Sequence, residues 1–435
     1  MEQKYENNKL EELIGAARRS TAVHRATNPP VAGGEVHSPV VELVTYILTD
    51  ALRQNASEIH IEPGRTGGRL RYRIDGALTT IGPPVPTELY GSIISRLKIM
   101  CRLNIAETRL PQDGRCSYQY GDQEIDVRVS VVPLIRGEKM VLRLLNRASR
   151  FLSLDSLQLS QENQNRFVSL CREPSGAIIM AGPVNSGKTT ALYGALHYLN
   201  DSGRNIVSIE DPVEYQLEGI NQLQVNTRIG LDFEEALQAV LRQDYDILAI
   251  GEIRSDAVAQ MLIRAALTGH LVFATIHTAE AAKVIYRLLE MGIKPYLLAV
   301  ALKGIVAQRL VPRLCPDCRQ VYQPDEGSDV ARFLGQGYEP GMKLFHRGGC
   351  AKCRGRGVRG RLAIQEIMLI SESVQRCIIN RADGRMLGQA IRESGMGTMQ
   401  EDGIKKARAG LVEIEEIMKV CEEGKRRGES GTGQE

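Results

Sequence analysis

The sequence has 435 residues, 43% of them hydrophobic and 25% charged, which are the proportions of a soluble globular protein with room for two or three domains. A formal net charge of only +3 gives no general affinity for nucleic acid. No apolar run reaches the roughly 18 residues of a membrane span, residues 1–20 lack an export-signal core, and nine cysteines are too few for a disulfide scaffold, so we expect a protein of the reducing cytosol.

The first third of the chain is predicted to be a leader followed by one α+β domain. Residues 1–38 hold at most a short helix and then a linker containing Pro and Gly, which we expect to be flexible. Residues 39–148 alternate between helical spacing and the period of two that is typical of strands. The expected helices span 40–54 and 88–100, and the expected strands span 59–61, 70–74, 124–132 and 140–145.

Two arginines of this domain are candidates for contacts with a phosphate. Arg109 and Arg115 bracket residues 110–114, a segment rich in turn-forming residues that can present a guanidinium to an anion. For any single arginine, a solvated strand face is the simpler interpretation. We therefore give these two as candidates that need a structural test.

The clearest motif is a phosphate-binding loop, with the spacing Gly-x4-Gly-Lys-Thr over residues 182–189. An apolar run at 177–181 precedes it and helical spacing over 190–199 follows, which is the strand–loop–helix context that the motif requires. The loop N–H groups and the helix N-terminus attract an anion. We predict that ATP binds there, with Lys188 at the β- and γ-phosphates and the Thr189 hydroxyl on Mg²⁺. The predicted nucleotide-binding residues are Gly182, Pro183, Val184, Asn185, Ser186, Gly187, Lys188, Thr189 and Thr190.

After residue 148 the pattern becomes one of strands alternating with helices, which is typical of a parallel sheet. Four short apolar runs each end in polar residues, and they span 177–181, 206–209, 247–250 and 271–276. Ligands of open α/β sheets bind beyond the carboxyl ends of the strands. We therefore expect these polar residues to meet around the nucleotide.

Charge and position suggest a role for each of these polar residues. Glu252 follows the third run and is the expected Walker-B-type acid for Mg²⁺. Glu210 ends the second run and is the better candidate to orient or deprotonate the attacking water. His277 ends the fourth run and is expected at the γ-phosphate, while Arg242 and Arg254 are positioned to pair with phosphate in the same or a neighbouring subunit. A helix cap is the alternative for one strand-end glutamate, and a core residue is the alternative for one histidine.

Two CxxC pairs occur later in the chain, Cys315 with Cys318 and Cys350 with Cys353. Such pairs can meet as a tetrahedral thiolate site for zinc. A redox pair would explain one CxxC but not two, and a reducing compartment favours metal. We predict a structural zinc module over 313–365. The remaining cysteines look like ordinary core or surface residues, namely Cys101, Cys116, Cys171, Cys377 and Cys421.

Basic residues gather around the second CxxC pair. Seven of them, with no acid between, are Lys343, Arg347, Lys352, Arg354, Arg356, Arg359 and Arg361. Part of this charge offsets the thiolates, and the rest suggests an acidic partner or an anionic membrane surface. The scarcity of aromatic residues among these basic residues argues against binding of single-stranded nucleic acid.

The C-terminal part of the chain follows this basic stretch. We expect a helical region over 366–423 and a disordered tail over 424–435.

Taken together, these segments resemble the secretion ATPases of type II secretion and type IV pilus assembly, from about residue 40 to about 420. Besides the phosphate loop, the segments that carry the resemblance are 59–63, 109–115, 209–215, 241–254 and 268–278, and the tetracysteine segment resembles the branch that drives assembly. The resemblance implies an α/β fold with a RecA-like P-loop core over 149–312 and a PAS-like α+β domain over 39–148. It also implies that the family's large N-terminal docking domain is replaced by about 38 residues.

The same resemblance implies a cytoplasmic homo-hexamer, peripheral at the inner face of the cytoplasmic membrane. ATP hydrolysis would drive an inner-membrane platform protein and, indirectly, pilin-like subunits, with no direct contact to nucleic acid. Glu210 and Glu252 would be the hydrolytic acids, and Arg109 and Arg115 would contact nucleotide from a neighbouring subunit.

Three residues depart from the family pattern, and two other functions remain open. Asn185 replaces a glycine but tolerates a left-handed backbone, while Tyr245 and Ser255 stand where proline and aspartate are usual. The alternatives are a DNA-uptake or conjugative motor of the same superfamily, which nucleic acid would stimulate, and a regulatory or scaffold protein without turnover.

Overall fold

The computed structural model describes residues 9–19, 38–145 and 153–429. The chain divides into two compact units, residues 1–148 and 149–435. Much of the predicted leader (1–8 and 20–37) and of the predicted tail (430–435) lies outside the described residues. Among the described residues, no helix has both the length and the apolar character that a membrane span would need.

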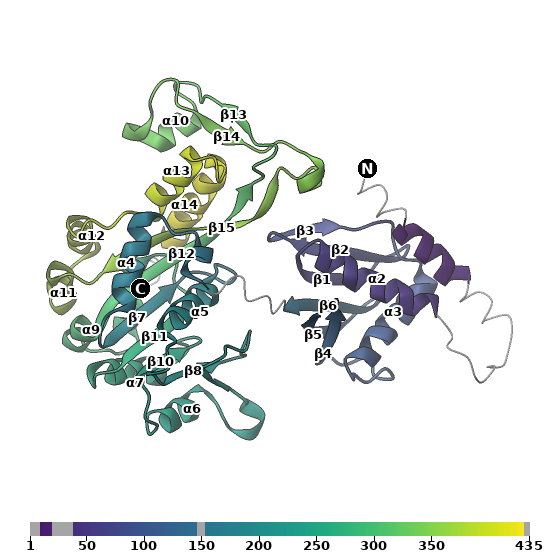
Figure 1. The fold of residues 1–435 in the computed structure, drawn as a ribbon, viewed down its shortest axis with the longest axis horizontal. Helices are drawn as coiled ribbons and strands as arrows, with labels where there is room; N and C mark the ends of the chain where they lie inside the picture. Colours follow the sequence, from purple (N-terminus) through teal and green to yellow (C-terminus); the bar gives the residue numbers. More distant parts are fainter. Residues whose placement is uncertain (1–8, 20–37, 146–152, 430–435) are drawn as a thin grey trace. The chain divides into compact units, whose positions relative to one another are not determined.

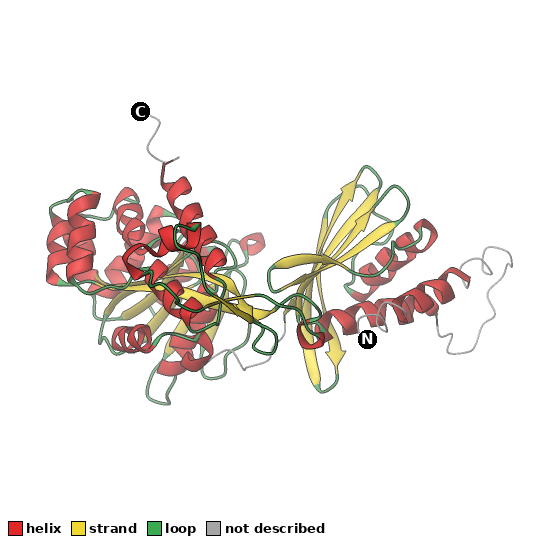
Figure 2. Ribbon diagram, turned by 90° about the horizontal axis from the view of Figure 1, so that it is seen from above, coloured by secondary structure: helices red, strands yellow, loops and turns green. Residues whose placement is uncertain are grey.

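The first unit is built on an antiparallel sheet with the strand order β3-β2-β1-β6-β5-β4. Its strands are β1 (Ala56–Pro63), β2 (Gly68–Ile74), β3 (Ala77–Thr80), β4 (Gln112–Tyr120), β5 (Gln123–Leu134) and β6 (Gly137–Leu145). Alternation decides the faces: Leu70 and Tyr72 of β2 are buried beneath the helices, whereas Arg71 between them lies on the opposite face. The helices α2 (Pro39–Arg53) and α3 (Thr87–Met100) cover the apolar face (Figure 2).

The structure differs from the sequence-based expectation at two strands of this unit, and it contains the short helix that the sequence allowed in the leader. The short strand β3 was not predicted, and β4 begins at Gln112, inside the segment expected to be a turn. Arg115 is therefore a strand residue, paired across the ladder with Arg128. Residues 9–19 form a helix whose Leu10 and Ile14 are buried in the core of this unit, so this part of the leader is structured.

The second unit is an α/β layer structure around a sheet with the order β15-β12-β7-β11-β10-β8-β9 (Figure 1). Its strands are β7 (Gly176–Ala181), β8 (Ile206–Glu210), β9 (Asn221–Gln224), β10 (Ile247–Ile250), β11 (Leu271–Ile276), β12 (Leu302–Leu314) and β15 (Val358–Leu369). The strands from β12 to β9 are parallel, and β15 runs antiparallel to β12. The four predicted apolar runs are β7, β8, β10 and β11, and both faces of these strands are buried.

Helices cover both faces of this sheet. On one face α4 (Gln161–Cys171) and α5 (Lys188–Leu199) pack against Ile178 and Met180, and on the other α7 (Asp256–Leu267) and α8 (Ala281–Glu290) pack against Ile179. The remaining helices are α6 (Phe233–Val240), α9 (Pro295–Ala301), α10 (Asp329–Leu334), α11 (Glu372–Ile379), α12 (Gly384–Glu393), α13 (Met399–Arg408) and α14 (Ile414–Glu429).

The C-terminal part is less separate from the core than the sequence suggested. The strands β12 and β15 were not predicted, and they form a long antiparallel pair at the edge of the main sheet. The cysteine segment projects from between them, with its own small strands β13 (Gln320–Tyr322) and β14 (Leu344–His346). The helices expected from residue 366 begin only after β15 ends at Leu369, and α14 continues past residue 423.

Candidate active site

The predicted phosphate loop lies between β7 and α5, in the conformation that its glycines permit. A Cβ on Gly182 would come within 2.3 Å of the Ser186 Oγ and 2.6 Å of the Gln308 carbonyl oxygen, so a side chain does not fit there. Asn185 has φ of 62°, a left-handed conformation that asparagine adopts more readily than most residues. The loop backbone is thus shaped for an anion at the N-terminus of α5.

Lys188 is folded back onto the loop that carries it. Its Nζ donates hydrogen bonds to the carbonyl oxygens of Gly182 (2.7 Å) and Pro183 (2.8 Å). The side chain is only 7% exposed. Burial lowers the pKa of Lys188 to about 8, with Glu252 acting in the opposite direction and Arg309 adding to the decrease. The carbonyl oxygens that accept from Lys188 carry no full negative charge. An incoming phosphate can therefore replace them as the partner of the ammonium.

A continuous polar chain connects Lys188 to residues at the ends of three neighbouring strands. The Nζ of Lys188 lies 3.2 Å from Nδ1 of His277, and Nε2 of His277 lies 2.6 Å from Oε1 of Glu252. The guanidinium of Arg254 donates to Glu252 (2.8 Å) and to Asp211 (2.9 Å). We call this set the Lys188–Asp211 chain. It brings together residues that follow β7, β11, β10 and β8, which are adjacent in the sheet.

Glu210 is held in a different set of hydrogen bonds. It is 3% exposed, and it accepts from the Ser208 hydroxyl (2.6 Å), the Gln222 amide (3.1 Å) and the Tyr193 hydroxyl. Burial and the Glu210 charge raise the pKa of Tyr193, so this phenol stays protonated as a donor. The carboxylate is one residue from Asp211, yet none of its hydrogen bonds in the described structure reaches the Lys188–Asp211 chain. Its orientation is therefore fixed by α5 and β9.

Three of the predicted arginines, Arg109, Arg115 and Arg242, are exposed. Arg242 is exposed in the turn after α6. In the first unit Arg109 is exposed and paired with Glu107 (2.9 Å), and Arg115 lies 3.5 Å from Asp126. Thr189 and Thr190 are half-buried in the first turn of α5.

Sequence reasoning missed a buried support beneath the phosphate loop. The Gln308 amide of β12 donates to the Ser186 carbonyl (2.8 Å), and the Gln365 amide of β15 donates to Oε1 of Gln308 (3.2 Å). The backbone N–H of Gln365 donates to Asp402 (2.9 Å), which also accepts from Lys406 (2.7 Å). We call this the Gln308 chain. A glutamine inside an apolar strand was the available signal, but β12 itself was not predicted.

The four cysteines predicted to bind metal meet at one point. Their Sγ atoms all lie within 4.8 Å of one another, with Cys318–Cys353 at 3.6 Å, Cys350–Cys353 at 3.7 Å and Cys315–Cys350 at 3.9 Å. Tetrahedral zinc with bonds of about 2.3 Å requires sulfur–sulfur distances of about 3.8 Å. Burial raises the pKa of Cys353, but the N–H groups of Cys350 and Gly357 outweigh burial and lower it to about 6. This donor set fits zinc.

The basic stretch around these cysteines is partly neutralised. Arg347 pairs with Glu413 (2.7 Å) and Glu416 (3.0 Å) near the start of α14, and Lys352 pairs with Asp317. Arg359 and Arg361 are exposed on β15. The charge available to an external partner is therefore smaller than the sequence suggested.

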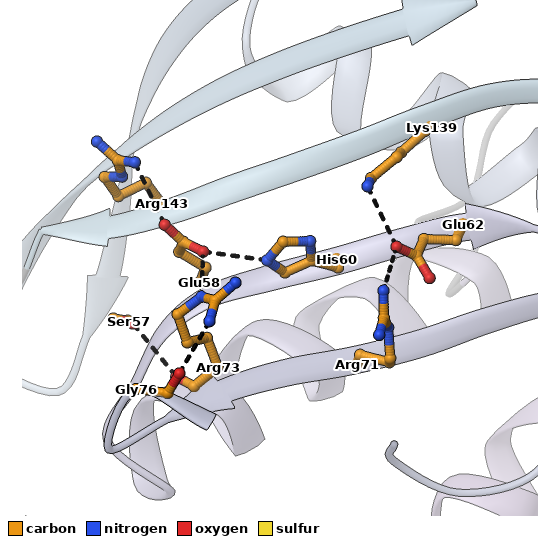
Figure 3. A network of polar contacts seen from close by, with 9 residues as sticks. All are labelled: Ser57, Glu58, His60, Glu62, Arg71, Arg73, Gly76, Lys139 and Arg143. Atoms are coloured by element: carbon orange, nitrogen blue, oxygen red, sulfur yellow. Dashed lines mark hydrogen bonds and ion pairs between the residues drawn. The ribbon is translucent and has the colours of Figure 1, made fainter. Parts of the chain in front are cut away.

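The open face of the first sheet carries a second charged network (Figure 3). Five basic side chains surround two carboxylates, Arg73 and Arg143 at Glu58 and Arg69, Arg71 and Lys139 at Glu62. Burial raises the pKa of Glu62, but hydrogen bonds from Arg71 and Lys139 outweigh burial and lower it to about 2. His60 contacts Glu58 at 3.1 Å. The segment 59–63 is thus part of a positively charged surface.

Comparisons with known proteins give a consistent result. A family model described as "Type II/IV secretion system protein" matches residues 34–419. The type II secretion system protein E of Pectobacterium carotovorum subsp. carotovorum is 44% identical over 386 residues, which is 89% of this chain and 76% of that protein. The type II secretion system ATPase E of Vibrio cholerae serotype O1 is 40% identical over 404 residues, 93% of this chain and 80% of that one.

Solved structures show the fold. The ATPase DotB of Legionella pneumophila has a TM-score of 0.65 at 18% identity and covers 91% of this chain and 97% of its own. The pilus retraction motor PilT with bound ADP has a TM-score of 0.59 at 23% identity, and the match covers 86% of this chain and 95% of that structure's chain. The predicted α/β ATPase fold is confirmed by this likeness.

Proposed function

The chain belongs to the type II/IV secretion system protein family, and from that membership we propose that it hydrolyses ATP at the 182–190 loop to energise type II secretion. The observation that carries the proposal is the Lys188–Asp211 chain. Each of four adjacent parallel strands is followed by at least one polar residue of this chain, at the end of the sheet where open α/β folds bind ligands. A lysine, a carboxylate and an arginine at a phosphate-binding loop are the groups that phosphoryl transfer requires.

In this proposal each residue has one task. Lys188 exchanges its carbonyl partners for the β- and γ-phosphates. Thr189 and Glu252 would hold Mg²⁺, which would neutralise phosphate charge. His277 and Arg254 fix the Glu252 carboxylate in place. Glu210, oriented by its three donors, positions and deprotonates the attacking water.

The assembly that this function needs extends beyond one chain. We assign residues 39–148 to a PAS-like domain, 149–312 to a RecA-like core, 313–365 to a zinc module and 366–423 to a C-terminal region, which is helical after β15 ends at Leu369. Six copies form a ring at the cytoplasmic face of the inner membrane. Arg109 and Arg115 reach the nucleotide of a neighbouring subunit, and Arg242 reaches nucleotide in the same or a neighbouring subunit. The ring acts on a membrane platform protein and through it on pilin-like subunits. Identity to relatives named for type II secretion supports this assignment.

The test is phosphate release and ATP retention by the purified protein with Mg²⁺. Lys188→Ala should lose ATP retention, because it removes the ammonium expected at the β- and γ-phosphates. Glu210→Gln should retain ATP and release phosphate about 10²–10⁴-fold more slowly, the contribution of one general base. Glu218→Gln, at an exposed glutamate of the same unit, should behave as the unmodified protein. Unchanged turnover in Lys188→Ala would refute the proposal.

A further inference from the structure

Two cysteines outside the metal centre lie in direct contact in the first unit. Cys101 follows the last residue of α3, and Cys116 lies in the middle of β4. Their Sγ atoms are 2.9 Å apart. Cys101 is 3% exposed, whereas Cys116 is half-buried and open to solvent on one side. No cysteine in the described residues forms a disulfide.

The distance separates this pair from the zinc-type cluster. Three sulfur pairs in that cluster stand 3.6–3.9 Å apart, and all four sulfur atoms lie within 4.8 Å of one another, as ligands of a common ion can. At 2.9 Å the Cys101 and Cys116 sulfurs are too close for that arrangement, and among the described residues no third ligating side chain joins them. A disulfide has a sulfur–sulfur bond of about 2.05 Å, so a movement of less than about 1 Å would form it.

We propose that Cys101 and Cys116 are a reversible oxidation site, whose disulfide closes residues 102–115 into a covalent loop. The enclosed segment is long enough to matter, because it spans the connection from α3 to β4 and carries Arg109 and Arg115. In the reduced protein this segment is held by partly buried hydrogen bonds, including Lys98 Nζ to the Glu107 carbonyl (2.8 Å) and Gln112 to the same carbonyl (2.8 Å). The disulfide adds a covalent restraint at its base.

The chemistry needs a hydroperoxide as oxidant, and hydrogen peroxide serves. The hydrogen bond from Cys101 lowers the pKa of Cys116 and favours its thiolate, and Cys116 is also the more exposed of the two. The Cys116 thiolate attacks one peroxide oxygen, the O–O bond breaks, and hydroxide leaves and takes up the proton that the thiol released, so that a sulfenic acid and water result. The Cys101 sulfur then attacks the Cys116 sulfur, and the S–O bond breaks with release of a second water. Two thiols and one hydrogen peroxide give one disulfide and two waters.

The consequence for activity rests on the proposed function, because it requires that Arg109 and Arg115 reach a neighbouring nucleotide. A segment closed at its base has fewer conformations with which to follow that nucleotide through the catalytic cycle. We therefore expect the oxidised protein to release phosphate more slowly than the reduced protein. The disulfide itself does not depend on the protein being an ATPase.

The bond can be read directly in the full-length protein after treatment with one equivalent of hydrogen peroxide. Trypsin cuts after Lys98, Arg102, Arg115 and Arg128, so peptide 99–102 should appear linked to peptide 116–128. The linked pair should vanish on reduction and in Cys116→Ser, and it should persist in Cys377→Ser. A sulfinic acid at Cys116 with a free thiol at Cys101, or linkage only among the four clustered cysteines, would overturn the proposal.

Turnover gives a second and separable result. Phosphate release should fall on oxidation and recover on reduction in the unmodified protein, with no fall in Cys116→Ser. If the linked peptide forms and turnover stays constant, the effect on the loop is refuted although the disulfide stands. If the reduced protein releases no phosphate at all, the proposed function fails, and the peptide result still decides the oxidation site.

Discussion

Lys188 shows how one residue is prepared for a ligand by its surroundings. Its ammonium is buried against two loop carbonyls, and burial lowers its pKa to about 8. Between pH 8 and its usual value the lysine is neutral in the folded chain and protonated in the unfolded one. The folded protein therefore gains stability as pH rises through this window. Triphosphate binding acts in the opposite direction, because negative charge favours the protonated lysine.

ATP binding should consequently take up protons at alkaline pH. At about pH 8.5 Lys188 is neutral in a large part of the free protein, so the binding of one ATP should take up nearly one proton. The affinity for ATP should fall as pH rises further. Calorimetric titrations in two buffers of different ionisation enthalpy should give different heats at this pH and nearly equal heats at about pH 7. If the two buffers gave equal heats of binding at about pH 8.5 as well as at about pH 7, the lowered pKa of Lys188 would be contradicted.

The residues of this site were predictable to different degrees. Gly182 to Thr190 are contiguous and follow a strict spacing, and Glu252 and His277 follow short apolar runs that are typical of buried strands. Asp211 joins the site through side-chain geometry, which spacing alone does not give, and Arg254, a candidate for phosphate, pairs in the structure with Asp211 and Glu252. Cys101 and Cys116 carry no CxxC signal and meet only because α3 and β4 fold together.

At the scale of elements, the hidden strand β12 has the largest effect. It places Gln308 between the phosphate loop and β15, and so links Ser186 to Asp402 through buried amides. The strands β7, β8, β10 and β11 were readable because both of their faces are apolar. Gln308 and Arg309 interrupt the apolar pattern of β12, and β4 alternates between exposed and half-buried polar residues, so neither strand was recognised.

Removing the Gln308 amide should weaken both the loop and the fold. In Gln308→Leu the Ser186 carbonyl and the Gln365 amide lose their partners, which should cost about 1–3 kcal/mol of unfolding free energy. ATP affinity should fall as well, since the loop loses its support from below. Urea unfolding and nucleotide titration measure the two effects. Gln336→Leu, at an exposed position in the same unit, should change neither, and equal behaviour of the two variants would refute the role of Gln308.

For the whole molecule, the cysteine cluster acts as an anchor at the end of the β12–β15 pair. β12 ends at Leu314, one residue before Cys315, and the Leu314 N–H donates to the Leu411 carbonyl (2.8 Å) ahead of α14. Arg347 ties the cysteine segment to the same region through Glu413. Zinc at the four thiolates would therefore join the end of the sheet to the C-terminal helices.

Loss of one thiolate should release the metal and loosen this region without removing the phosphate loop. Elemental analysis should find one zinc per chain, and much less in Cys353→Ser, with Cys377→Ser as the control. Each kcal/mol lost shifts the melting temperature by about 2–4 °C in a domain of this size, so we expect a fall of several degrees while ATP retention persists. A protein with no zinc, or a variant that melts as before, would contradict a structural metal.

The polar groups that meet at the phosphate loop come from strands that are neighbours in space but far apart along the chain. Parallel strands cannot be joined by a tight hairpin, so each must be reached through its own crossover. Residue 188 is synthesised some ninety positions before residue 277, and the two first touch when the intervening helices have docked. A nascent or excised fragment that stops before His277 lacks one member of the Lys188–Asp211 chain and should not cleave nucleotide, so the onset of hydrolysis during biosynthesis would report that these four strands are in place.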